Sequence, residues 1–150
     1  MDRDDNGRGR ATISDRTPGE YIAAALGAVY VLVGILGFFV TGGVEFAATN
    51  GDKLLGVFEV NPLHNLVHLA IGIALIAAFY SGAGAVRAVA TIIGAVYVIL
   101  GIVGFFIEGE DVNILALNVA DHILHLASGA ALLVAAALTR DASVKARRAT

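Results

Sequence analysis

Cysteine is absent from this sequence of 150 residues, and charged side chains are scarce. The lack of cysteine excludes disulfide bonds, thiolate nucleophiles, zinc fingers and cysteine-ligated iron–sulfur clusters. Charged residues make up 15% of the chain and hydrophobic residues 57%, whereas a soluble domain has about 25% and about 45–50%. So few charges cannot cover a water-soluble globule, and so many hydrophobic residues exclude a disordered chain. The composition therefore predicts a single domain embedded in a membrane.

Long runs without charge predict four transmembrane helices. Residues 21–40 and 88–107 contain no charged side chain, and each run would be about 30 Å long as a helix, which matches the hydrocarbon core of a bilayer. Two further runs, 63–80 and 118–138, are apolar apart from a few polar residues near their starts. The expected fold is therefore an all-α bundle of four transmembrane helices in a lipid bilayer. Its parts are a flexible tail at 1–20, helices at about 21–41, 61–80, 86–107 and 114–139, and a basic tail at 140–150.

The basic residues predict how the chain is oriented. Only Lys53 falls between the first and second helices, and none falls between the third and fourth. The other nine lysines and arginines lie before the first helix, in the turn between the second and third, or after the fourth. The positive-inside rule then places both termini in the cytoplasm. The net charge of −3, with no aromatic residues among the basic ones, gives no reason to expect nucleic-acid binding.

The first and third helices are near copies of each other. LGAVYVLVGILGFFVTGG at 26–43 aligns without a gap with IGAVYVILGIVGFFIEGE at 93–110, and the second and fourth helices align more weakly. The chain is therefore interpreted as two tandem helical hairpins that run parallel across the membrane. Glycines seven residues apart, such as Gly27 and Gly34, permit close packing of helices. The same glycine-containing faces could also support a homo-oligomer.

A stripe of polar residues follows one face of the second helix and one face of the fourth. The i, i+3, i+4, i+7 spacing places the members of each stripe on one side of a helix, in the outer part of the membrane. Such stripes should face the interior of the bundle rather than lipid. They include all four histidines of the protein. The candidate site residues are Asn61, His64, Asn65, His68, Asn118, Asp121, His122 and His125.

These residues permit several interpretations. The first is a buried polar network in a non-enzymatic structural or accessory protein, with Asn61 and Asn118 capping their helices and Asp121 paired with His64. The second is a bound cofactor: a transition-metal ion, since imidazole suits such ions, or a haem held between two histidines. The third is a pH sensor or proton relay. The ligands of the ion would be His64, His68, Asp121 and His125, and those of the haem His68 and His125.

No hydrolase or transferase pattern occurs in the sequence. Ser128 lies three residues from His125, but the nearby acid, Asp121, is on the same helix. No glycine-rich phosphate loop follows a strand. The protein is therefore expected not to be an enzyme. No cofactor is predicted, and the transition metal and the haem are kept as alternatives.

Three segments together resemble a known family. LLGVFEVNPLHNLVHLAIGIA at 54–74, GAVYVILGIVGF at 94–105 and NVADHILHLASG at 118–129 are similar to the integral membrane family catalogued as domain of unknown function 4383, found in bacteria and archaea. The resemblance spans about 21–138. It implies a four-helix protein of a prokaryotic plasma membrane, and it brings no activity and no functional residues. The family tends to have Asn where this chain has His122, which suggests that Asn65 and His122 occupy equivalent positions in the two repeats.

Overall fold

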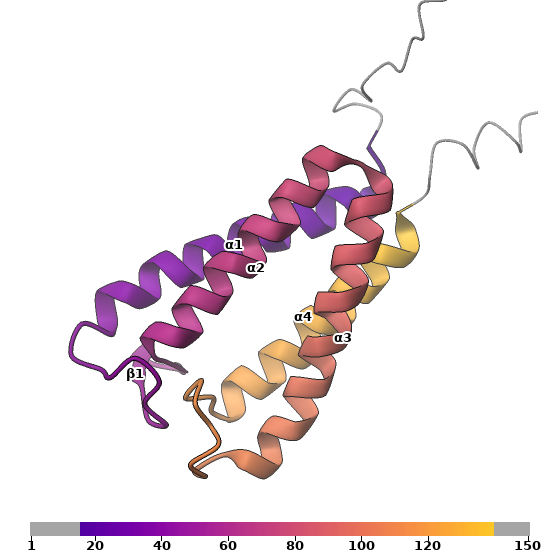
Figure 1. Ribbon diagram of the computed structural model, residues 1–150. Helices are drawn as coiled ribbons and strands as arrows, with labels where there is room; N and C mark the ends of the chain where they lie inside the picture. The colour runs from indigo at the N-terminus through magenta and orange to yellow at the C-terminus, as the bar shows by residue number, and fades with distance from the viewer. Residues whose placement is uncertain (1–15, 140–150) are drawn as a thin grey trace, which may run out of the picture.

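The computed structural model of the protein describes residues 16–139. Within them the chain forms four helices and one small hairpin of two strands, so the expected all-α bundle of four helices is confirmed (Figure 1). The predicted tails lie outside the described residues, except for residues 16–20. The elements in chain order are α1 (Pro18–Val40), β1 (Asp52–Leu54), β2 (Phe58–Val60), α2 (Pro62–Ser81), α3 (Ala83–Ile107) and α4 (Val119–Leu138).

The helices form two antiparallel pairs. α1 packs mainly against α2, and α3 packs mainly against α4. The start of α1, the turn between α2 and α3, and the end of α4 all lie at one end of the bundle, whereas β1, β2 and the loop before α4 lie at the other (Figure 1). We call these the terminal end and the loop end. Within residues 16–139, the loops that connect the helices therefore fall at one of two opposite ends.

Side-chain caps set where α1 and α2 begin. Thr17 accepts a hydrogen bond from the backbone of Glu20, and the Glu20 carboxylate accepts one from the backbone of Thr17. This capping box, with Pro18 in the first turn, starts α1 three residues before the expected position. Asn61 caps α2 by accepting a hydrogen bond from the His64 N–H.

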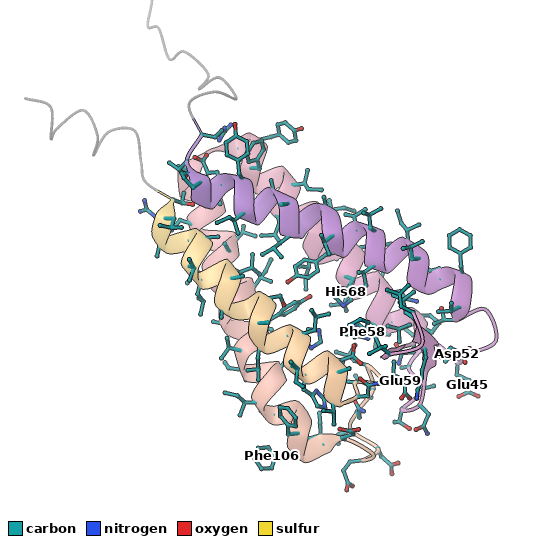
Figure 2. The ribbon with its side chains drawn as sticks, turned by 180° about the vertical axis from the view of Figure 1, so that it is seen from behind. Glu45, Asp52, Phe58, Glu59, His68 and Phe106 are labelled. Carbon is teal, nitrogen blue, oxygen red and sulfur yellow. The ribbon has the colours of Figure 1, made fainter. Side chains whose placement is uncertain are left out.

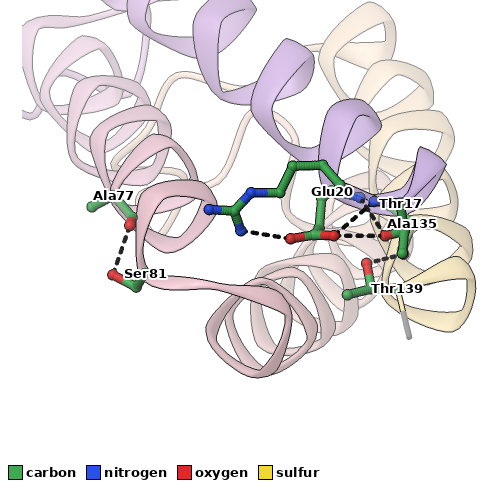
Figure 3. Close-up of polar contacts among 7 residues, drawn as sticks. Thr17, Glu20, Ala77, Ser81, Ala135 and Thr139 are labelled. Carbon is green, nitrogen blue, oxygen red and sulfur yellow. Dashed lines mark hydrogen bonds and ion pairs between the residues drawn. The ribbon is translucent and has the colours of Figure 1, made fainter. Parts of the chain in front are cut away.

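The terminal end is held by polar contacts (Figure 3). Arg16 Nη1 lies 2.7 Å from Glu20 Oε1, and its guanidinium lies 4.9 Å from the centre of the Phe79 ring. The Thr139 hydroxyl donates to the carbonyl of Ala135 over 2.8 Å. Arg87 Nη2 donates to the Thr139 carbonyl over 3.0 Å. The Arg87 bond ties the start of α3 to the end of α4.

The structure corrects the expected bounds of α3 and α4. α3 begins at Ala83 rather than at 86, because Gly82 alone connects it to α2, with a φ of 115° that favours glycine. α4 begins at Val119 rather than at 114. Before it, the Asn113 side chain accepts from Leu117 N and donates to Leu117 O, which holds the chain in a turn instead of a helix.

A β-hairpin, which was not expected from the sequence, covers the loop end. Leu54 pairs with Phe58 and Asp52 with Val60 in antiparallel register. The turn between the strands has positive φ angles of 54° at Leu55 and 73° at Gly56. Leu54 and Val60 are buried beneath the hairpin. The hairpin therefore packs onto the helices and does not extend freely from them.

The bundle is apolar outside, and its interior mixes apolar residues with polar and small ones. All four helices are long and apolar enough to cross a membrane, and the shortest have 20 residues, about 30 Å. Large apolar side chains face outward along them, including Phe39 and Phe106, which are 81% and 80% exposed. Asparagine, histidine and glycine are buried instead. Four apolar helices of this length, with apolar side chains on their outer faces, are those of a membrane protein.

Matching contacts recur in the two helix pairs. A Cβ placed on Gly27 would lie 3.0 Å from the carbonyl oxygen of Gly72, and one placed on Gly94 would lie 2.9 Å from that of Gly129. These two glycine pairs are aligned in the sequence repeat. At these positions the glycine faces of α1 and α3 are therefore filled by α2 and α4 of the same chain.

Candidate metal centre

Three histidines meet in the half of the bundle nearest the loop end. His64 and His68 lie one turn apart on α2, and His125 lies on α4. They are 2%, 4% and 3% exposed. One nitrogen from each ring can be chosen so that all three atoms lie within 4.8 Å of one another. We call these residues the histidine triad.

The rings of the triad are in direct contact. His64 Nε2 and His68 Nε2 are 2.8 Å apart, and the ring centres of His68 and His125 are 6.1 Å apart with an angle of 23° between their planes. A hydrogen bond between two imidazoles needs one protonated and one unprotonated nitrogen. The unprotonated nitrogen is the kind of lone-pair donor that a metal ion binds.

Other nitrogens of the triad are buried without a hydrogen bond. Nδ1 of His64, of His68 and of His125 have no hydrogen-bond partner in the described part of the chain. An unpaired buried polar group costs on the order of 1–3 kcal/mol. These Nδ1 atoms are therefore available to bind a further polar group or an ion.

A small pocket opens beside the triad, with a volume of about 70 Å³. This is room for a metal ion and a few water molecules. The hairpin forms one wall, and in Figure 2 His68 lies inside the bundle close to Phe58 of β2, whereas Phe106 points away at the far end of α3. The lining residues are Val33, Leu54, Leu55, Phe58, Val60, His64, His68, Asp121, Leu124 and His125.

Asp121 lines the same pocket but does not pair with His64 as expected. Its Oδ2 accepts hydrogen bonds from the Asn118 N–H over 3.0 Å and from the Glu59 N–H over 3.1 Å. The hydrogen bonds expected from the imidazole thus come instead from backbone N–H groups at the start of α4 and in β2. His64 pairs with His68 instead.

The two capping asparagines also hold the loops at this end. Asn61 Nδ2 donates to Ala48 O over 2.7 Å and to Ile114 O over 2.8 Å, which ties the loops of both helix pairs together. Asn118 caps α4, and its Nδ2 donates to Val57 O over 2.9 Å. The expected capping roles of both residues are seen. Asn61 also joins the two loops, and Asn118 holds the turn of the hairpin.

Asn65 and His122 lie away from the triad. Asn65 Nδ2 donates to Thr41 Oγ1 over 3.0 Å, and His122 Nε2 lies 3.5 Å from Glu108 Oε2. Each faces the other helix of its own pair, because a glycine, Gly37 or Gly104, leaves room for it there. Both residues thus contact the residue that follows the preceding helix, and neither lines the pocket.

Two tyrosines complete the cluster and were not among the candidate residues. The ring of Tyr97 lies 4.7 Å from His125, and that of Tyr30 lies 5.4 Å from His68 and 5.4 Å from Tyr97, measured between ring centres. Both are buried. The sequence signal for their place beside the histidines was that the two tyrosines align when segments 26–43 and 93–110 are compared.

The pocket does not fit a haem. Drug-sized ligands occupy roughly 300–1,000 Å³, and a porphyrin is larger than most of them, whereas this pocket measures about 70 Å³. The rings of His68 and His125 also stack nearly parallel rather than facing each other across a gap. A single ion fits both the volume and the spacing of the ring nitrogens.

A comparison with known families places the chain. The model of the family described as domain of unknown function DUF4383 matches residues 20–138. No curated protein and no solved structure matches the chain. Since the match covers most of the sequence, including all four helices, the chain belongs to the DUF4383 family.

Proposed function

We propose that this DUF4383 protein binds one divalent transition-metal ion at the histidine triad, as a non-enzymatic multi-pass protein of a prokaryotic plasma membrane. The observation that carries the proposal is the meeting of three buried imidazoles from two helices, with ring nitrogens within 4.8 Å of one another. Imidazole nitrogens suit zinc, copper, iron and nickel. The site would bind the ion and would not catalyse a reaction.

The spacing of the ring nitrogens is close to that of a tetrahedral site. Zinc–nitrogen bonds of about 2.0–2.1 Å place two ligand nitrogens about 3.4 Å apart. His64 and His68 are closer than this, at 2.8 Å, and the whole set spans up to 4.8 Å. The separations between these nitrogens would have to change by up to about 1.4 Å to match the ideal tetrahedral distance. The ion would replace the His64–His68 hydrogen bond with two coordinate bonds.

The surroundings do not favour catalysis or a transmembrane proton path. The Ser128 hydroxyl donates to the backbone oxygen of His125, not to its ring, so these residues do not form a nucleophile–base pair. Farther toward the terminal end, the buried side chains of Leu75 and Leu132 fill the core. Neither can carry a proton, so the polar cluster has no continuation along the bundle through them.

The direction of the termini is part of the proposal. The terminal end carries Arg16 and Arg87 in the described chain, and the loop end carries Lys53. Over the whole sequence, nine of the ten basic residues precede α1, follow α4 or lie at the start of α3. The positive-inside rule supports cytoplasmic termini, which would place the histidine triad in the outer half of the membrane.

Metal analysis of the full chain tests this function. The protein, purified in detergent, is stripped with a chelator, equilibrated with Zn²⁺ and freed of excess metal, and the zinc per chain is measured. We expect one equivalent for the wild type and a loss of binding for His125→Asn. His122→Asn is the matched control, because it removes a buried histidine of α4 that lies outside the triad. A wild type without zinc, or equal binding by both variants, would reduce the triad to a buried polar network.

A further inference from the structure

Asp121 is a buried carboxylate without a cation. It is 3% exposed, and no lysine or arginine of residues 16–139 forms an ion pair with it. Burying an unpaired charge is costly. The amides at the start of α4 offset part of that cost, since anions are favoured at a helix N-terminus. The pocket that Asp121 lines contains the three imidazoles and no positive charge.

Asp121 also holds the β1–β2 hairpin, which forms one wall of that pocket. Its Oδ2 accepts the N–H of Glu59 in β2 over 3.1 Å. This bond and the Asn118–Val57 bond are the polar ties between the hairpin and the start of α4 within the described chain. Both of these hydrogen bonds of Asp121, from Asn118 and from Glu59, end on Oδ2, and the same residue lines the pocket.

We propose that Asp121 is the fourth ligand of the ion at the histidine triad and that it leaves the hairpin to bind it, so that ion binding loosens the β1–β2 hairpin. The inference rests on the proposed function, because it assumes that the triad holds an ion. It adds Asp121 as the ligand that completes the site, and it names the β1–β2 hairpin as the segment that responds to ion binding.

The geometry requires the carboxylate to move. Asp121 lies outside the group of ligand atoms within 4.8 Å of one another, although it sits one helical turn from His125 on the same face of α4. Rotation of its side chain toward the triad would break the bond to the Glu59 N–H. The bond to the Asn118 N–H is local to the helix start and can adjust. Three imidazoles and one carboxylate then make a closed tetrahedral site.

The charges favour this exchange. A divalent ion surrounded by three neutral imidazoles would carry its full charge into a region of low dielectric, where unpaired charge is costly. Asp121 is the one acidic residue lining the pocket. Its carboxylate would halve the charge of the ion, and the ion would supply the cation that the carboxylate lacks. Hydrogen bonds from backbone N–H groups cannot supply that charge.

Asp121→Asn is the variant that separates charge from shape. Its side-chain oxygen can still accept both N–H groups, so the cap of α4 and the tie to the hairpin remain. We expect Zn²⁺ affinity, measured by titration calorimetry on the stripped full chain in detergent, to fall at least about tenfold, a loss that even outer-shell partners cause. With Co²⁺ as probe, the wild type should show the intense visible bands of four-coordinate cobalt and the variant should not.

Amide hydrogen exchange measures the response of the hairpin. In the wild type, saturating Zn²⁺ should speed exchange at Glu59 and leave Leu117 unchanged, because the Leu117 N–H is held by Asn113 in the other loop. In Asp121→Asn, Zn²⁺ should change neither. Unaltered zinc affinity and cobalt bands in the variant, or slower exchange at Glu59 in the zinc-bound wild type, would overturn the inference alone. A wild type that binds no zinc would overturn the proposed function as well.

Discussion

Gly37 on α1 and Asn65 on α2 are packed so closely that a methyl group at Gly37 would overlap the Asn65 carboxamide. Gly104 and His122 stand in the same relationship on α3 and α4, with the imidazole in place of the carboxamide. In lipid, helices gain stability from close packing rather than from hydrophobic burial between them. Small residues opposite large polar ones therefore hold each helix pair together and direct Asn65 and His122 away from the triad.

Gly34→Ala should destabilise the bundle. Its new Cβ would lie 2.7 Å from the Asn65 carbonyl oxygen and 2.7 Å from Leu69 Cγ, and overpacking of this kind costs about 1–3 kcal/mol. Gly84→Ala is the control, because Gly84 also lies in a helix but has no atom within 4 Å of the added Cβ. Thermal unfolding in detergent, followed by circular dichroism, should show a lower midpoint for the first variant only. Equal midpoints would contradict the close α1–α2 contact.

Gly104→Ala should be rescued by a second substitution. Its Cβ would overlap the His122 imidazole, and His122→Ala removes that ring. We expect the double variant to be more stable than the sum of the single effects predicts, by at least about 0.5 kcal/mol. Gly43→Ala, where the new Cβ meets nothing within 4 Å, should instead be additive with His122→Ala. The unfolding free energies of the variants give both comparisons.

The helices could be predicted from the sequence because membrane spans depend on local hydropathy. Their ends could be predicted less well. α1 begins earlier than its apolar run because Thr17 and Glu20 cap it, and α4 begins later because Asn113 holds a turn. The hairpin was missed because strands of three residues are stabilised by contacts with the helices beneath them, and such contacts leave no periodic pattern.

The site could be predicted in part. The i, i+4 spacing of His64 and His68 requires a shared face, and the repeat places His125 at the same level on α4. Which polar residues face the triad depends on distant partners. Asn65 and His122 occupy space left by glycines of the neighbouring helices, and Asp121 is held by a backbone N–H 62 residues away. Because these partners are distant in the sequence, the spacing of the polar residues could not predict which of them face the triad.

Cysteine labelling should reveal the orientation of the chain. Since the native sequence has no cysteine, Val112→Cys and Ser81→Cys each provide one accessible thiol, at the loop end and the terminal end respectively. In intact cells, a membrane-impermeant maleimide should label Val112→Cys, and Ser81→Cys should react only after permeabilisation. The reverse result would place the histidine triad in the inner half of the membrane and overturn the proposed orientation without affecting the proposed metal site.

Zinc should stabilise the wild type against unfolding, and a chelator should reverse the effect. A ligand that binds only the folded state at 100 times its dissociation constant adds about 2.7 kcal/mol. Because the triad joins α2 to α4, the ion would crosslink the two helix pairs, which have fewer contacts with each other than each has within itself. His125→Asn removes the ligand from α4 and should unfold at the same temperature with or without zinc, whereas His122→Asn should retain the shift. Thermal scans in detergent at a fixed zinc concentration measure this difference, and an equal shift in both variants would assign the stabilisation to zinc bound elsewhere.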